Sequence, residues 1–113
     1  MADFALLYRG RNIPSSPEQR QRHLDKWYAW FKDMAAKGSL KDKGLPLDDG
    51  GKVVRGSQKT FHDGPYAESK DVVAGFSIIE ANDLAAAAAI ASDCPILDVG
   101  GSVEVRPVRQ MST

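Results

Sequence analysis

The stretch Val72–Pro95 reads VVAGFSIIEANDLAAAAAIASDCP and joins an extended segment to a helical one. Its first ten residues are rich in β-branched and aromatic side chains, which favour a β-strand. Asn82 or Asp83 then provides an N-cap, five consecutive alanines favour a helix, and the closing proline ends it. The stretch therefore predicts a strand over 72–81 and a helix over 82–95, whose small side chains permit close packing on a sheet.

An earlier strand and helix precede this unit. Asp3–Arg9 (DFALLYR) is apolar on both alternating faces, which indicates a central strand. Ser16 is suited to the N-cap of a helix, Pro17 to its first position and Gln19 to a capping box, while Gly38 is suited to its end. The apolar positions of this helix follow helical spacing and form a stripe that can cover a sheet: Leu24, Trp27, Tyr28, Phe31 and Met34, with Trp30 beside them.

The remaining segments complete an α+β pattern within a single domain, 1–113. Residues 39–54 read as loop, residues 50–64 as extended chain interrupted by a glycine, and residues 102–109 (SVEVRPVR) as an alternating strand. Two helices on one face of a small antiparallel sheet form the ferredoxin-like arrangement. Such a sheet leaves one apolar face open, with Ala5 and Leu7 on it, and a two-fold homodimer is the simplest cover.

Composition excludes several classes of function. The chain carries 15 basic and 15 acidic residues, so it lacks the positive field that nucleic-acid binding needs. Its apolar runs are too short to cross a bilayer, and its single cysteine, Cys94, permits no internal disulfide. These features predict a soluble, cytoplasmic protein without membrane or nucleic-acid partners. Its two histidines and one cysteine lack ligand spacing, and its glycines lack nucleotide-binding spacing, so we expect no metal and no cofactor.

The stretch HDGPYAESK, residues 62–70, concentrates chemically active side chains beside a Gly-Pro turn. A carboxylate near an imidazole tunes that imidazole for acid–base work, and His23 lies on the edge of the apolar stripe of the first helix. Asp63 also has a structural interpretation, in which it accepts main-chain hydrogen bonds in the turn. The residues alone leave both interpretations open.

The stretches 63–95 and 101–108 resemble the YCII-related family, in its DGPF-domain branch. The branch pattern is Asp-Gly-Pro-aromatic, Glu and Lys, then a Gly-aromatic strand, an alanine-rich helix ending in Pro, and Glu-Val-Arg-Pro. The matching residues are Asp63, Gly64, Pro65, Tyr66, Glu68, Lys70, Gly75, Phe76, Pro95, Glu104, Val105, Arg106 and Pro107. Tyr66 stands where phenylalanine is commoner, and the resemblance extends over nearly the whole chain.

The resemblance implies a dimeric α/β-barrel of ferredoxin-like subunits. It also implies a His-Asp pair in a cleft, with His23 matching the family histidine and Asp63 as the candidate carboxylate. One relative in this family is a dehydrochlorinase acting on a chlorinated aromatic. Others are encoded beside extracytoplasmic-function sigma factors, which implies a regulatory association for some members.

Three functional hypotheses follow. The first is a small-molecule lyase or isomerase, with His23 and Asp63 as acid–base residues. Its substrate is contacted by Tyr66, Trp27, Glu68 and Arg106. The second is a non-catalytic small-ligand binder that uses the same cleft, and the third is an interaction protein associated with a sigma factor. The sequence does not decide whether the protein is an enzyme.

Overall fold

The central strand β1 (Ala2–Arg9) organises the fold. In the computed structural model, which describes residues 1–10, 14–65 and 71–111, it pairs antiparallel with β5 (Val73–Ala81) and with β6 (Ser102–Pro107). The three-residue strand β2 (Leu40–Asp42) pairs with the other edge of β5, so the sheet order is β2-β5-β1-β6. The prediction that residues 3–9 form a central strand is confirmed.

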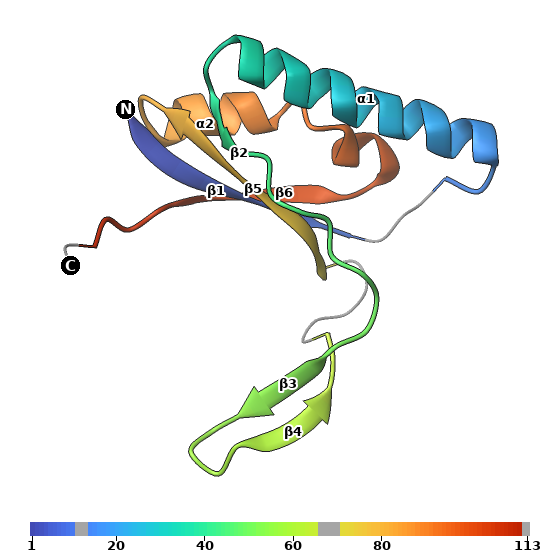
Figure 1. Cartoon of the computed structure of the whole chain (residues 1–113), viewed down its shortest axis with the longest axis vertical. Helices are drawn as coiled ribbons and strands as arrows, with labels where there is room; N and C mark the ends of the chain where they lie inside the picture. Colours follow the sequence, from blue (N-terminus) through green and yellow to red (C-terminus); the bar gives the residue numbers. More distant parts are fainter. Residues whose placement is uncertain (11–13, 66–70, 112–113) are drawn as a thin grey trace.

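Two helices cover one face of this sheet, and the opposite face is hereafter the outer face (Figure 1). They are α1 (Pro17–Ala36) and α2 (Leu84–Ala91), followed by the short 3-10 helix η1 (Pro95–Val99). Together with the strand order, this confirms the predicted α+β, ferredoxin-like fold. Among the described residues, no helix is both long and apolar enough to cross a bilayer.

Strand alternation separates the two faces. Phe4, Leu6 and Tyr8 of β1 are buried beneath the helices, whereas the residues between them are half-buried on the outer face. On β5, Ser77 and Ile79 alternate in the same way and are fully buried. The core therefore lies entirely between the sheet and the helices.

The ends of α1 follow the predicted capping signals. The Ser16 side chain accepts a hydrogen bond from the main-chain N–H of Gln19 at 3.1 Å, and Pro17 is the first helical residue. Beyond the C-terminal end, Gly38 adopts the left-handed conformation, with φ of 77°. Both boundaries are therefore determined by local sequence.

Only part of the predicted apolar stripe of α1 is buried. Trp30 and Met34 are buried, but Leu24 is 42% exposed and Tyr28 is 56% exposed. The prediction that Leu24 and Tyr28 pack on the sheet is wrong, because the N-terminal half of α1 stands away from it and both side chains line a cavity there.

The segment 39–54 contains more regular structure than its loop-like sequence predicts. After β2, the chain continues along the edge of β5, where the N–H of Leu47 donates to the carbonyl of Ala74 at 2.8 Å. It then forms β3 (Lys52–Arg55) and β4 (Thr60–Asp63), a separate two-stranded hairpin. The hairpin projects on the outer-face side of the sheet, away from both helices (Figure 1).

Gly44 permits the close approach of this segment to β5. Its φ is 70°, and a Cβ there would lie 1.7 Å from the carbonyl oxygen of Phe76.

We expect Gly44→Ala to lower the free energy of unfolding by about 3 kcal/mol or more, because the cost of a left-handed backbone at alanine adds to the cost of the steric overlap with Phe76. Gly38→Ala is the control: φ is 77° with open space around the position, so it should cost about 1–2 kcal/mol. Equal losses for the two variants in urea denaturation would contradict this packing.

Cys94 is buried, and burial raises the pKa of its thiol from 9.0 to about 12. Burial disfavours the thiolate in the folded state. The protonated thiol therefore contributes fully to the stability of the folded protein below pH 9, and this contribution is lost as the pH rises toward 12. We expect the folded protein at pH 8 to resist a thiol reagent that modifies the denatured chain fully. Rapid modification of the folded protein would contradict this burial.

Candidate functional site

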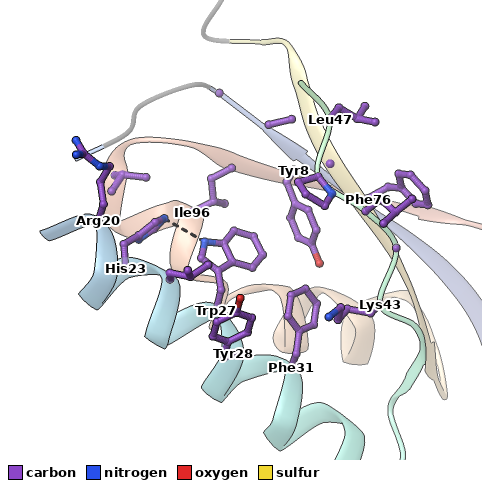
Figure 2. A pocket seen from close by; sticks show the side chains of 18 of the residues that line it. Tyr8, Arg20, His23, Trp27, Tyr28, Phe31, Lys43, Leu47, Phe76 and Ile96 are labelled. Atoms are coloured by element: carbon purple, nitrogen blue, oxygen red, sulfur yellow. Dashed lines mark hydrogen bonds between the residues drawn. The ribbon is translucent and has the colours of Figure 1, made fainter. Parts of the chain in front are cut away.

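A cavity of about 650 Å³ lies between the N-terminal half of α1, the segment 43–47 and strand β5 (Figure 2). Its size is typical of small-molecule sites, which span about 300–1,000 Å³. The exposed side chains of Leu24, Tyr28, Leu45 and Leu47 belong to its lining. The cavity is therefore lined by apolar side chains that the fold leaves exposed to solvent.

Aromatic side chains form one wall of the cavity. Trp27 and Tyr8 meet edge to face, with ring centroids 4.9 Å apart and an interplanar angle of 85°. Phe31 lies 5.7 Å from Trp27 on the same helix, and Tyr28 completes the group (Figure 2). Such contacts restrict ring motion, so this wall is already shaped to receive a flat apolar molecule.

His23 lies beside this wall, one helical turn before Trp27. The indole Nε1–H of Trp27 donates to Nε2 of His23 at 3.0 Å (Figure 2). An acceptor nitrogen carries no proton, so the neutral ring holds its proton on Nδ1. Trp27 therefore fixes the tautomer of His23 and occupies the lone pair that a base would use.

A buried pair of hydrogen bonds holds Tyr8 of the aromatic wall in place. The Tyr8 hydroxyl donates to the Ser77 hydroxyl at 2.8 Å, and Ser77 donates to the main-chain carbonyl of Lys43 at 2.6 Å. Burial raises the pKa of Tyr8 well above its ordinary value of 10.0, so the phenol stays neutral. These bonds tie β1, β5 and the segment 43–47 into one frame.

Three charged residues also line the cavity: Arg20, Lys43 and Asp49. Arg20 donates to the main-chain carbonyls of Pro14 and Ser15 at 3.3 and 3.0 Å, which holds its guanidinium near the start of α1. Two cations against one acid favour a ligand with anionic or strongly accepting oxygens. Among the described residues, no group of histidine, cysteine and acidic side chains has the geometry of a metal site.

The structure does not bring the predicted His23–Asp63 pair together within one chain. His23 lines the cavity, but Asp63 does not: it lies on β4, where its carboxylate accepts from Lys52 at 2.6 Å. The hairpin register pairs these two residues directly, and the Asp63 side chain is 90% exposed. Asp63 is thus paired with a lysine side chain, which differs from the turn interpretation, in which it accepts from main-chain amides.

The other predicted contact residues divide into three groups. Trp27 lines the cavity, as described above. Arg106 lies opposite Ala5 on the outer face, because Val103 and Val105 of the same strand face the core, so the sheet separates Arg106 from the cavity. Tyr66, Glu68 and Lys70 lie outside the described residues.

The sequence did not identify Tyr8, Ser77 or the segment 43–47 as parts of a site. Tyr8 and Ser77 occupy ordinary inward positions of strands, and only the pairing of those strands brings their hydroxyls together. The predicted loop over residues 39–54 includes this segment, but a loop prediction does not indicate which strand the segment approaches.

Comparison with known proteins identifies a matching family and a matching fold. Residues 4–112 match the profile of the YCII-related domain. A solved structure of 5-chloro-2-hydroxyhydroquinone dehydrochlorinase (TftG) from Burkholderia phenoliruptrix AC1100, in complex with 2,5-dihydroxybenzoquinone, has the same fold. The TM-score is 0.51 and the identity 17%, with 96% of this chain and 95% of the other covered. No curated protein sequence matches the chain.

Ser77 is the residue on which the cavity frame depends. We expect Ser77→Ala to lower the free energy of unfolding by about 3 kcal/mol, because it leaves the Tyr8 hydroxyl and the Lys43 carbonyl without their partner. Ser92→Ala, which removes an exposed hydroxyl bonded at 2.6 Å to Ala89 on α2, should cost less than about 1 kcal/mol. Thermal and urea unfolding measure both, and equal losses would refute the role given to Ser77.

Proposed function

This chain belongs to the YCII-related domain family, and we propose that it binds a flat, oxygenated organic molecule in the α1 cavity and acts on it as a lyase or isomerase. The observation that carries the proposal is the aromatic wall with His23 held beside it by Trp27. A wall of this kind favours ring stacking, and Arg20 and Lys43 suit the oxygens of a phenol, quinone or carboxylate.

His23 is the proposed acid–base residue. When His23 acts as a base, its Nε2 gives up the hydrogen bond from the Trp27 indole and takes a proton from the substrate. The protonated ring has two N–H donors and no acceptor, so it no longer binds the Trp27 indole and is set to return the proton as an acid. In the resting state, the hydrogen bond from Trp27 is made to an Nε2 that carries no proton.

The similarity to TftG supports the choice of ligand class. TftG is a dehydrochlorinase, and its structure holds a dihydroxylated benzoquinone. A ring of that kind fits the described wall of Tyr8, Trp27, Tyr28 and Phe31 in flatness and polarity. Membership of the DGPF branch, and substrate contacts from Tyr66 and Glu68, are part of this proposal and rest on the sequence alone.

We assign Asp63 no role in the proposed reaction. Its own chain holds it on the hairpin against Lys52, outside the lining of the cavity that contains His23. Arg106, on the outer face, is likewise excluded from the substrate contacts of its own chain.

One observation favours a second candidate, a binder without turnover. The Nε2 lone pair of His23 already accepts a hydrogen bond from Trp27, so His23 can serve a ligand as a donor through Nδ1–H. Release of chloride or a change in the ultraviolet spectrum of a chlorinated hydroquinone distinguishes an enzyme from a binder. The association with a sigma factor stays a prediction of the sequence resemblance.

The binding test uses 2,5-dihydroxybenzoquinone as the probe, in titration calorimetry and thermal-shift measurements. We expect the probe to raise the melting temperature of the protein, and His23→Ala to weaken its binding about tenfold through the loss of one strong hydrogen bond. Trp27→Phe should retain the stacking surface but release the tautomer of His23, which nitrogen-detected NMR reports directly.

The matched control is His62→Ala, which removes an exposed histidine on the hairpin that does not line the cavity. It should leave probe binding unchanged. Equal weakening by His23→Ala and His62→Ala, or the absence of binding by the unmodified protein, would contradict the proposed site.

A further inference from the structure

The cavity beside α1 is larger than a ligand with a single ring requires. Its volume is about 650 Å³. A cavity of about 150 Å³ is sufficient to hold one benzene ring, so a benzoquinone with two hydroxyl groups fills less than half of the space available here. The remaining volume can hold a further part of the ligand, and the side chains around it indicate the chemistry of that part.

The wall that α1 contributes to the cavity is polar at one end and apolar at the other. Arg20 and His23 are one turn apart near the start of the helix, and Trp27 and Phe31 follow at intervals of four residues. From His23 to Phe31 the helix extends about 12 Å. Figure 2 shows Arg20 and His23 toward one end of the cavity and Phe31 toward the other. A ligand whose oxygens contact His23 and Arg20 therefore has its remaining part beside the apolar end.

Four exposed apolar side chains surround this remaining space. Leu24 and Tyr28 lie on α1 between His23 and Phe31, whereas Leu45 and Leu47 belong to the segment 43–47 and are 67% and 51% exposed. Figure 2 shows Leu47 across the cavity from α1. A single leucine in water is common in folded proteins, but four large apolar side chains around one cavity form the kind of patch that marks a binding surface.

The two leucines of the segment 43–47 are held in place by the main chain. The N–H of Leu47 donates to the carbonyl of Ala74 at 2.8 Å, and the carbonyl of Leu45 accepts from the N–H of Phe76 at 3.4 Å. Pro46, between the leucines, forms a β-bridge with Gly75. These contacts fix the segment along the edge of β5, so the apolar surface is formed before a ligand binds, which lowers the entropic cost of binding.

We propose that the oxygenated ring of the ligand carries an apolar substituent about the size of a phenyl group, and that this substituent lies between α1 and the side chains of Leu45 and Leu47. Tyr28 and Phe31 favour a second ring on the α1 side, because aromatic rings pack edge to face or offset against one another. The inference rests on the proposed function, since it requires His23 and Arg20 to contact the oxygenated ring.

Titration calorimetry tests the proposal by comparing 2,5-dihydroxybenzoquinone with its 3-phenyl derivative, which carries the same oxygens. We expect the derivative to bind about tenfold more tightly, which is the gain from burying an apolar group of ring size. The double variant Leu45→Ser/Leu47→Ser should lower the ratio of the two affinities about fivefold, because it removes the apolar cover from one side of the phenyl group. Both leucines are exposed, so the double variant should remain folded, and circular dichroism checks this.

Leu84→Ser is the matched control, since Leu84 is a half-exposed leucine on α2 that does not line the cavity. It should leave the affinity ratio unchanged. His23→Ala should weaken both compounds by the same factor and so also preserve the ratio.

The two proposals fail in different ways. If the unsubstituted quinone binds but the phenyl group adds no affinity, or if the added affinity survives in the double variant, the apolar substituent is refuted and the proposed function stands. If neither compound binds the unmodified protein, the proposed function is refuted, and the inference about the substituent with it.

Discussion

The hydroxyl of Ser77 is the contact on which the site depends. It accepts from Tyr8 on the neighbouring strand and donates to the carbonyl of Lys43, so it fixes the edge of the sheet to the segment that follows β2. Because that segment is held close to β5, it cannot approach the N-terminal half of α1. Trp30 and Met34 pack on the sheet, while Leu24 and Tyr28 stand over the resulting cavity. The exposed apolar surface of the site is therefore a consequence of the fold.

The two faces of the sheet present different sets of side chains. The helix side contains the aromatic wall, His23 and the charged residues Arg20 and Lys43. The outer side contains the half-buried Ala5 and Leu7 of β1 and the hairpin β3–β4, whose Val54 and Phe61 are exposed. Strand alternation keeps the two sets apart, since a residue and its immediate neighbour on β1 or β5 point to opposite sides. A substitution on one side can thus be examined without altering the other.

The sequence predicted the features that local interactions determine. Ser16, Pro17 and Gly38 set the limits of α1 through their own backbone and capping preferences. Apolar residues on both faces predicted β1 as a central strand, and β-branched and aromatic residues predicted β5 as a strand. Strand β2 was not predicted, because three residues are too few to show the alternation of a strand. It forms only by pairing with the edge of β5. Helical spacing predicted the apolar face of α1, but it does not reveal how far the sheet extends beneath it, so Leu24 and Tyr28 were misassigned.

The candidate site was predictable only in part, for similar reasons. His23 was singled out by its place on the edge of the apolar stripe and by the family resemblance, and Trp27 by helical spacing. The hydrogen bond between them follows from their separation of four residues on α1. The position of Asp63 depends on the hairpin register, which places it opposite Lys52, and no local signal specified that pairing. Tyr8 and Ser77 are 69 residues apart in the chain, and their hydroxyls meet only because β1 pairs with β5.

The most direct test of the central claim follows the indole N–H signals of Trp27 and Trp30 by NMR during titration with 2,5-dihydroxybenzoquinone. We expect the Trp27 signal to shift strongly, since this N–H donates to His23 in the cavity wall, while the amide signals of Val54 and Phe61 on the hairpin β3–β4 stay in place. An unchanged Trp27 signal, with shifts confined to the hairpin β3–β4 or to Ala5 and Leu7 on the outer face, would contradict ligand binding in this cavity.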